Sequence, residues 1–577
     1  MAKGEATVQE LVDQIGRNEI QLPEMQRQYV WRASRVRDLF DSLYRGWPSG
    51  AILLWETDED VALQDFAVEQ SLASTSTPKL LLDGQQRLTS LSAVIRGEPI
   101  KTRGRKRPIE LLFNLDHPAA SGPVTEVEEG DDADADDTGD DEELELDGVD
   151  QSDASESDIL QNVAEMTFIV KVNRLAKLPN WVSVSEVFAN EDNVHFIKQA
   201  GVSSMDDPRF NLYNTRLNRL RQIKKYVYRL DTLERSLSYE EVTEIFVRVN
   251  SLGAKLRSSD LALAQITAKW RGSLATFQEF QRQTTKTGLD LDLGTHLRAL
   301  IVMASGQSHF RSVASIDLPT LQRAWGEAVH GTNFACNFLR SNCGLTSTAL
   351  FSSPFLVTAL AYYGHVHNYE ISESDVAALR RWALLANAKA RYSRGSSETI
   401  LDQDLAVMRA GGGPGQLLDR LAGQVGRLDV VEADLAGRNQ RSSLFKTLFV
   451  AMAQDGAKDW KTGVRIDLNH AGSQDRLQFH HIFPKDVLKS AYAPSMIDDL
   501  ANLAFIGGKT NREISNRPPA EYLPNMISEY GEERFAPHLV PLDGSLHDVG
   551  MYPAFLEQRR RLLAARINEF LNPHAGA

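Results

Sequence analysis

The stretch LQFHHIFPKDVL, residues 477–488, places two adjacent histidines after an apolar segment and ahead of a proline. Its first residues have the character of a β-strand. Because successive side chains of a strand point to opposite faces, His480 and His481 would lie in different surroundings. One imidazole could bind a metal ion while the other holds a substrate or a water. The competing interpretation is a buried edge strand that happens to contain two histidines.

The segment ANLAFIGGKTNREISN, residues 501–516, supplies the other parts that such a site needs. Asn502 begins the apolar run LAFI, which predicts a second strand. Asn511 comes nine residues later, near the start of a predicted helix. Two predicted strands and a helix would form a ββα unit. The family resemblance given below implies that this unit carries a site, with the two histidines on opposite faces.

The residue types suggest a role for each side chain. An imidazole titrates near neutral pH, so His481 suits the removal of a proton from water. His480 and Asn511 would offer one nitrogen and one oxygen to a divalent cation, which suits Mg²⁺ or Mn²⁺. A histidine in place of an acidic ligand moves this preference toward Mn²⁺, Ni²⁺ or Zn²⁺. Asn502 would orient either His481 or the turn.

A second unusual stretch, KLLLDGQQRLTSL, begins at residue 79. An apolar strand ends at Asp83, Gly84 permits a tight turn, and a helix starts within two residues. Such a corner points backbone N–H groups and a helix dipole at one place, which suits phosphate. The next three side chains add hydrogen-bond donors: Gln85, Gln86 and Arg87. The alternative is a purely structural Asp83–Arg87 pair across the turn.

Length and composition limit the class of protein. A chain of 577 residues is too long for one core, so we expect about three domains. No run of 18 apolar residues predicts a membrane span, and the N-terminal sequence lacks the apolar region of a signal peptide. Cys336 and Cys343 match neither zinc-ligand pairs nor a disulfide framework. We expect a cytoplasmic protein that makes no membrane contact.

The net charge of −15 comes from one segment. Between Val124 and Ile159 lie 18 acidic residues and no basic ones. Without these 18 of the 78 acidic residues, 63 basic residues stand against 60, a net charge of +3. The segment contains few apolar residues, so we predict a disordered acidic insert over residues 121–160. It would be a solubilising spacer or a nucleic-acid mimic that covers a basic groove.

The order of predicted elements indicates an α+β, helix-rich chain. Strand and helix patterns mix in residues 1–265, which we predict to be an α/β domain interrupted by the acidic insert. Helical patterns dominate residues 266–430, and AGGGPG at 410–415 is a flexible break. The predicted ββα unit belongs to a C-terminal domain over residues 431–577.

Three segments of the N-terminal part resemble the GmrSD-type (type IV) restriction enzymes. DGQQRLTSL resembles the nucleotide-site signature of their ParB/sulfiredoxin-like N-terminal domain, IQLPEMQRQYVW (20–31) resembles its opening segment, and IFVRVNSLGAKLRSSDLAL (245–263) resembles a later block. The resemblance implies a domain that binds and hydrolyses a nucleoside triphosphate, GTP or ATP. The nucleotide-site residues it implies are Asp83, Gly84, Gln85, Gln86 and Arg87, together with Arg248 and Asn250.

The C-terminal motifs are similar to those of HNH nucleases. FHHIFP resembles the first strand of the HNH (ββα-metal) fold, and NREISNRPPAEYL resembles the C-terminal signature of the GmrSD nuclease half. The resemblance implies His481 and Asn502 as catalytic residues, with His480 and Asn511 as metal ligands. The cysteines of the zinc-stapled HNH subtype are absent, so packing alone would hold the ββα unit.

Together the resemblances imply an NTP-regulated, modification-responsive endonuclease or nickase of antiphage defence that acts on double-stranded DNA, from phage or modified. In SspE-type relatives, which respond to phosphorothioate marks, the segment matching residues 20–31 helps to form the sensing surface. Its apolar members here would receive a sulfur or belong to the core: Pro23, Tyr29, Val30 and Trp31. Two alternatives stay open, a non-catalytic DNA-binding NTP switch and an RNase or toxin with the same fold. The sequence also leaves open the NTP, the modification and the oligomeric state, a homo-oligomer included.

Overall fold

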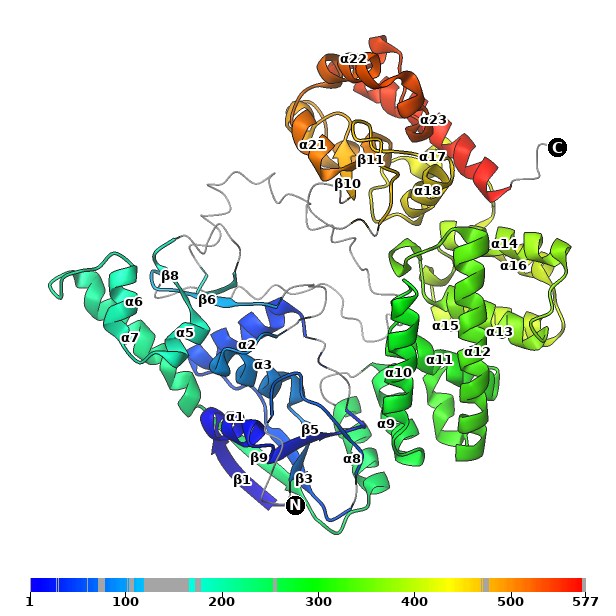
Figure 1. The fold of residues 1–577 in the computed structure, drawn as a ribbon. Helices are drawn as coiled ribbons and strands as arrows, with labels where there is room; N and C mark the ends of the chain where they lie inside the picture. Colours follow the sequence, from blue (N-terminus) through cyan, green and yellow to red (C-terminus); the bar gives the residue numbers. More distant parts are fainter. Residues whose placement is uncertain are drawn as a thin grey trace. The chain divides into compact units, whose positions relative to one another are not determined.

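The computed structural model describes residues 2–26, 29, 31–59, 61–70, 78–100, 102, 108–118, 166–171, 178–468, 470 and 477–572, apart from 253–256 and the side chains of 250–252. The acidic insert and most of the basic segment 101–107 lie outside these residues. The described chain divides into two compact units, one ending at Thr276 and the other beginning at Phe277 (Figure 1).

A six-stranded sheet forms the centre of the first unit, in the order β1-β9-β3-β5-β2-β4. Strand β5 lies inside the sheet, parallel to β2 and antiparallel to β3. The strands are β1 (Ala2–Thr7), β2 (Ile20–Pro23), β3 (Ile52–Glu56), β4 (Leu63–Gln64), β5 (Lys79–Asp83) and β9 (Val227–Leu233).

Helices cover both faces of this sheet, which explains why β5 reads as an uninterrupted apolar run. Leu81 packs into the core formed with α1 (Val8–Gly16), α2 (Ala33–Arg45) and α3 (Gln85–Arg96). Leu80 and Leu82 point to the other face and pack against α8 (Tyr239–Leu252) and α9 (Ser258–Lys269). The DGQQR stretch thus lies where a doubly covered strand turns into a buried helix.

A small three-stranded sheet completes the first unit, with β6 (Leu111–Asn114) between β7 (Phe168–Val170) and β8 (Trp181–Ser183). Three helices accompany it, α5 (Val184–Ala189), α6 (Asn193–Gln199) and α7 (Pro208–Arg221). Two basic side chains, one on α7 and one just after it, make hydrogen bonds within the first unit. Arg219 Nε donates to the Tyr44 carbonyl at 2.9 Å, and Lys224 Nζ donates to the Phe188 carbonyl at 3.1 Å.

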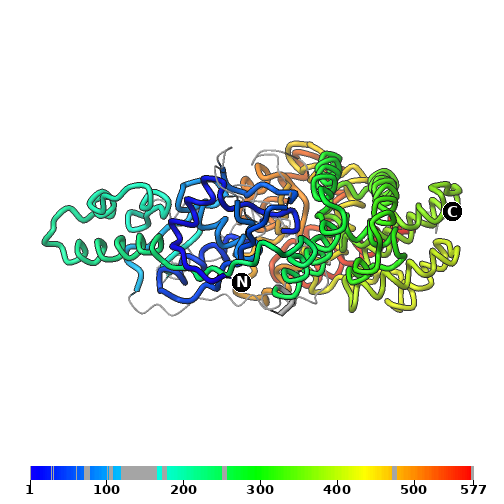
Figure 2. The backbone as a smooth tube through the Cα atoms, turned by 90° about the horizontal axis from the view of Figure 1, so that it is seen from below, coloured from blue at the N-terminus to red at the C-terminus, as the bar shows by residue number. Residues whose placement is uncertain are grey.

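The second unit begins with a helical array in which α11, α12 and α13 lie side by side (Figures 1 and 2). Gly331 of α12 allows the close approach of α13, because a Cβ atom there would lie 3.0 Å from the Ala361 carbonyl oxygen. The helices are α10 (Ser273–Lys286, which crosses the division), α11 (Leu293–Ser305), α12 (Leu318–Cys343), α13 (Phe355–Val366), α14 (Glu373–Ala388), α15 (Ser397–Arg409) and α16 (Pro414–Val425).

The ββα unit is present in the C-terminal part. Strands β10 (Leu477–His481) and β11 (Leu503–Gly507) pair antiparallel, and α21 (Gly508–Ile514) follows β11 directly. Helix α18 (Ser443–Gln454) covers the hairpin, with Phe445 ring centroids 5.0 Å from Phe479 and 4.8 Å from Phe505. Helices α22 (Pro519–Tyr530) and α23 (Tyr552–Leu571) complete this part of the unit.

The helical array and the ββα part share one apolar core, which runs from Leu289 to Leu571. Helix α14 contacts both α18 and α23. The boundary predicted at 265/266 therefore lies near the division of the chain, whereas the boundary predicted at 430/431 lies within the second unit. Among the described helices, none combines the length and apolarity that crossing a bilayer requires.

Candidate functional site

The two adjacent histidines of β10 occupy different environments, as the alternation of a strand requires. His480 pairs with Ala504 and its side chain is buried, with 3% of the residue exposed. His481 pairs with Leu503 and lies at the edge of the protein, half-buried. The hairpin thus presents one imidazole to the interior and one to solvent.

Asn511 of α21 lies against the buried histidine. His480 Nδ1 is 2.8 Å from Asn511 Oδ1, and Asn511 Nδ2 donates to Gln478 Oε1 at 2.7 Å. That second bond directs the amide oxygen toward the imidazole. On the far side of the ring, His480 Nε2 is 3.3 Å from the Tyr522 hydroxyl. The structure therefore brings together the two predicted metal ligands.

The electronic state of His480 suits metal binding. Burial lowers the pKa of His480 to about 4, so the ring is neutral near pH 7, as a ligand must be. Neighbouring ligands of an octahedral Mg²⁺ at about 2.0–2.1 Å lie about 3 Å apart, close to the 2.8 Å between His480 Nδ1 and Asn511 Oδ1. The pair fits a divalent cation. Within the described ranges, no group of three or more His, Cys, Asp or Glu side chains could hold a metal ion.

The solvent-facing histidine has an acidic neighbour that sequence reasoning missed. His481 Nε2 lies 3.1 Å from Asp498 Oδ1, and Lys485 Nζ lies 3.2 Å from the same oxygen. The hydrogen bond from His481 is the main reason why the pKa of Asp498 is lowered. Asp498 follows His481 by 17 residues, with no local pattern joining them. Only the closure of the loop between β10 and β11 brings them together.

Asn502 holds that loop and is fully buried. Its Oδ1 accepts a hydrogen bond from the Phe483 amide at 2.9 Å. Its Nδ2 donates to the carbonyls of Phe483 and Ile497, both at 3.0 Å. Of the two predicted roles, orienting His481 or the turn, these contacts belong to the turn.

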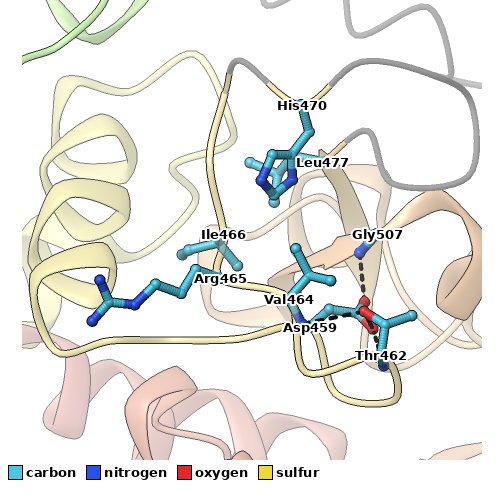
Figure 3. A pocket seen from close by; sticks show the side chains of 8 residues that line it. All are labelled: Asp459, Thr462, Val464, Arg465, Ile466, His470, Leu477 and Gly507. Carbon is cyan, nitrogen blue, oxygen red and sulfur yellow. Dashed lines mark hydrogen bonds between the residues drawn. The ribbon is translucent and has the colours of Figure 1, made fainter.

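Asp459 fixes the start of α21 and was not singled out from the sequence. Its buried carboxylate accepts from the Gly507 amide and from Thr510 Oγ1, both at 2.7 Å. A shallow cavity with room for about one water lies beside it (Figure 3). The cavity is lined by Asp459, Thr462, Val464, Arg465, Ile466, His470, Leu477 and Gly507. Because Asn511 directly follows Thr510 on α21, the carboxylate also helps to set where Asn511 lies.

The DGQQR corner in the first unit is tightly packed. Gly84 has φ +100°, and a Cβ atom there would lie 2.4 Å from Ile52 Cδ1, so only glycine fits. Arg87 Nη1 donates to the Ser49 carbonyl at 2.5 Å, and Nη2 donates to the Ala51 carbonyl at 2.8 Å and to Asp83 Oδ2 at 3.1 Å. Arg87 therefore ties the corner to the loop before β3. The Asp83 side chain stays 44% exposed beside it.

The other residues predicted to bind the nucleotide lie partly in the DGQQR corner and partly on α8. Gln85 and Gln86 are buried, and Gln86 Oε1 accepts a hydrogen bond from the Trp31 amide at 3.2 Å. Arg248 is on α8 with its side chain 73% exposed and pairs with Glu244. Asn250 also belongs to α8, but its side chain lies outside the described residues.

The segment proposed for sensing packs around α3. Tyr29 donates or accepts a hydrogen bond with Ser90 Oγ at 2.8 Å, and burial raises the pKa of this tyrosine. Trp31 is partly buried against the same core, and Pro23 is buried in β2. Val30 is not among the described residues. The described side chains thus connect this segment to the helix of the DGQQR corner.

Comparison with known proteins identifies the family of the N-terminal part of the chain. Residues 8–267 match the family model of the GmrSD restriction endonuclease, N-terminal domain. The chain is also similar to an uncharacterized protein of Methanocaldococcus jannaschii, with 23% identity over 556 residues that cover 90% of this chain and 86% of that protein. The match begins directly after β1, includes the other five strands of the sheet with the DGQQR corner, and ends within α9. Residues 8–267, somewhat less than half of the chain, are therefore a GmrSD-type N-terminal domain.

Proposed function

We propose that the protein is a metal-dependent DNA endonuclease or nickase of antiphage restriction, with an HNH-type site on β10, β11 and α21. One observation carries the proposal: the ββα unit places His480 against Asn511 on its buried face and His481 on its solvent face. The donor types support the proposal, because one imidazole nitrogen and one amide oxygen suit a divalent cation. The family of the N-terminal domain supports DNA as the substrate.

The proposed hydrolysis uses both faces of the β10–β11 hairpin. His481 takes a proton from a water molecule, which then attacks the phosphorus of the scissile phosphodiester. His480 and Asn511 would hold Mg²⁺ or Mn²⁺, which supplies charge stabilisation at the phosphate and the leaving oxygen. Asn502 and Asp459 keep the strand ends and α21 in place, so that the two faces hold their spacing.

The N-terminal domain would supply the control, through GTP or ATP bound at the DGQQR corner. The first N–H groups of α3 and the exposed Asp83 carboxylate are the groups available there. Arg87 would act by holding the corner closed, since its donors already meet two carbonyls and Asp83. A modified base or a phosphorothioate would be read through residues 20–31, whose Tyr29 and Trp31 touch α3.

Cleavage of supercoiled plasmid tests the proposal. The full chain is incubated with Mg²⁺ or Mn²⁺, with and without each NTP, on unmodified, phosphorothioated and glucosylated DNA and on RNA. We expect nicked or linear DNA, and a rate about 10²–10⁴ lower for His481→Ala. The control is His195→Ala, which removes an exposed histidine in the first unit. Equal rates for His481→Ala and wild type would reject the HNH-type site, and cleavage of RNA alone would favour an RNase.

A further inference from the structure

Asp498 stands at the C-terminal end of the short helix α20 (Pro494–Ile497) and reaches the solvent-facing histidine of β10. Its Oδ1 is 3.1 Å from His481 Nε2. An ionised carboxylate can only accept hydrogen bonds, so the proton of this contact belongs to His481 Nε2. The neutral ring then carries its free lone pair on Nδ1.

The position of Asp498 is set by the buried residues around it. The preceding carbonyl, of Ile497, accepts from Asn502 Nδ2 at 3.0 Å. The following residue, Asp499, is fully buried and accepts from the amides of Gly437 at 2.8 Å and Ala501 at 2.9 Å, besides pairing with Arg560. The backbone on both sides of Asp498 is therefore anchored, although its own side chain is 46% exposed.

We infer that Asp498 is a positioning residue for the proposed hydrolysis, which fixes the tautomer and the ring orientation of His481 so that Nδ1 faces the attacking water. The inference rests on the proposed nuclease function and adds a residue to it. The same carboxylate oxygen holds Lys485 Nζ at 3.2 Å, close to where the substrate phosphate would approach. A phosphodiester entering the site is an alternative partner for that ammonium group.

The alternative interpretation is that Asp498 and its basic neighbours form only an exposed ion pair, which contributes little to stability. The two interpretations predict different kinetics for the Asp498 variants. A positioning residue acts on the chemical step, so its loss lowers kcat and leaves KM for DNA nearly unchanged. A residue that matters only for DNA attraction would alter KM and its salt dependence.

The test compares Asp498→Ala and Asp498→Asn with the matched pair Asp486→Ala and Asp486→Asn in the full-length protein. Asp486 is an exposed acid that directly follows Lys485 in the sequence, and its carboxylate bonds to Lys489 and Asn516. Under single turnover with saturating plasmid, we expect Asp498→Ala to lower the cleavage rate by about 10- to 100-fold. Asp498→Asn keeps an acceptor oxygen and should recover part of that loss. Equal rates for the Asp498 and Asp486 variants would overturn the inference.

A spectroscopic measurement separates this inference from the nuclease proposal. In protein labelled with ¹⁵N-histidine, the His481 signals, assigned with His481→Ala, should show a protonated Nε2 in the wild type and a mixture of tautomers in Asp498→Ala. An unchanged tautomer would overturn the inference even if the plasmid is cut. Unchanged cleavage by His481→Ala would instead overturn the proposed nuclease site, and with it the role of Asp498. The melting temperatures of all variants establish that the variants are folded.

Discussion

His480 and His481 show how one backbone step separates two chemical environments, which suit the two roles proposed above. The buried ring has a pKa lowered to about 4 and faces an amide oxygen, whereas its neighbour faces solvent and a carboxylate. Neither role follows from the histidines alone. Each is decided by the residue that a different segment places against the ring.

The pairing of His480 with Asn511 predicts a metal affinity that can be measured without any cleavage. If His480 and Asn511 hold the cation as proposed, Asn511→Ala should weaken Mn²⁺ binding by about 10- to 100-fold, by analogy with changes that disturb metal sites. Isothermal titration of the full chain with Mn²⁺ measures this. Asn525→Ala, on the exposed surface of α22, is the matched control. Equal affinity in both variants would remove Asn511 from the metal site.

Asn502 makes a prediction about stability. Asn502→Ala leaves a buried Phe483 amide and two buried carbonyls without partners. Each such loss costs about 1–3 kcal/mol, so the free energy of unfolding of the second unit should fall by several kcal/mol. Urea denaturation followed by tryptophan fluorescence gives the value. A fall below about 0.5 kcal/mol would mean that the loop between β10 and β11 is held by something else.

At the scale of elements, both candidate sites lie where a strand turns into a helix. At the β5–α3 corner, Gly84 supplies the left-handed turn and Arg87 closes it. At the β11–α21 corner, the turn is held by Asp459 from a distant segment. Such corners expose the first N–H groups of a helix, which is why they recur in binding sites.

Arg87→Ala should open the first of these corners. The Ser49 and Ala51 carbonyls and Asp83 would lose a charged partner together. We expect faster hydrogen exchange in the loop before β3 and at the start of α3, together with loss of NTP hydrolysis. Arg209→Ala, which removes an exposed α7 arginine outside the predicted nucleotide site, provides the comparison. Wild-type exchange and full hydrolysis in Arg87→Ala would show that the corner neither depends on this arginine nor uses it.

The whole molecule contains buried histidines that make folding sensitive to acid. Burial lowers the pKa values of His117 in the first unit and of His296 and His538 in the second unit, each to about 4. In the unfolded chain a histidine titrates near 6.5. Between these values the unfolded state binds more protons than the folded state, so stability must fall as the pH drops from 6.5 toward 4.

Calorimetry of the full chain between pH 7.5 and 5 tests this expectation. Both units should melt at lower temperature as the pH falls, and most of the loss should appear below pH 6.5. The exposed variant His195→Gln should follow the wild-type curve, whereas His296→Gln should give a flatter dependence in the second unit. A melting temperature that stays constant over this range would show that these rings take up protons in the folded protein as readily as in the unfolded chain.

Much of the fold was open to prediction from the sequence because its signals are local. The apolar run KLLLD, the glycine after it and the helical pattern beyond specify a strand, a turn and a helix within one short segment. The alternation of side chains along a strand likewise predicted that His480 and His481 lie on opposite faces, as successive residues of β10 do. The division of the chain was harder to predict, since the shared core of the second unit depends on contacts between α14 and the distant α18 and α23.

The sequence by itself determined the helix-rich α+β class, the mixed N-terminal domain and the residues that could carry chemistry, because periodicity, turn residues and side-chain type are properties of short segments. Only the tertiary structure decided what those residues touch. Arg87 meets carbonyls 36 and 38 positions away, Asp459 reaches Gly507 across 48 positions, and Asp498 returns to His481 across 17. Such contacts form only when loops close and cores pack. A local sequence pattern therefore does not predict which distant carbonyl or carboxylate a given side chain will contact.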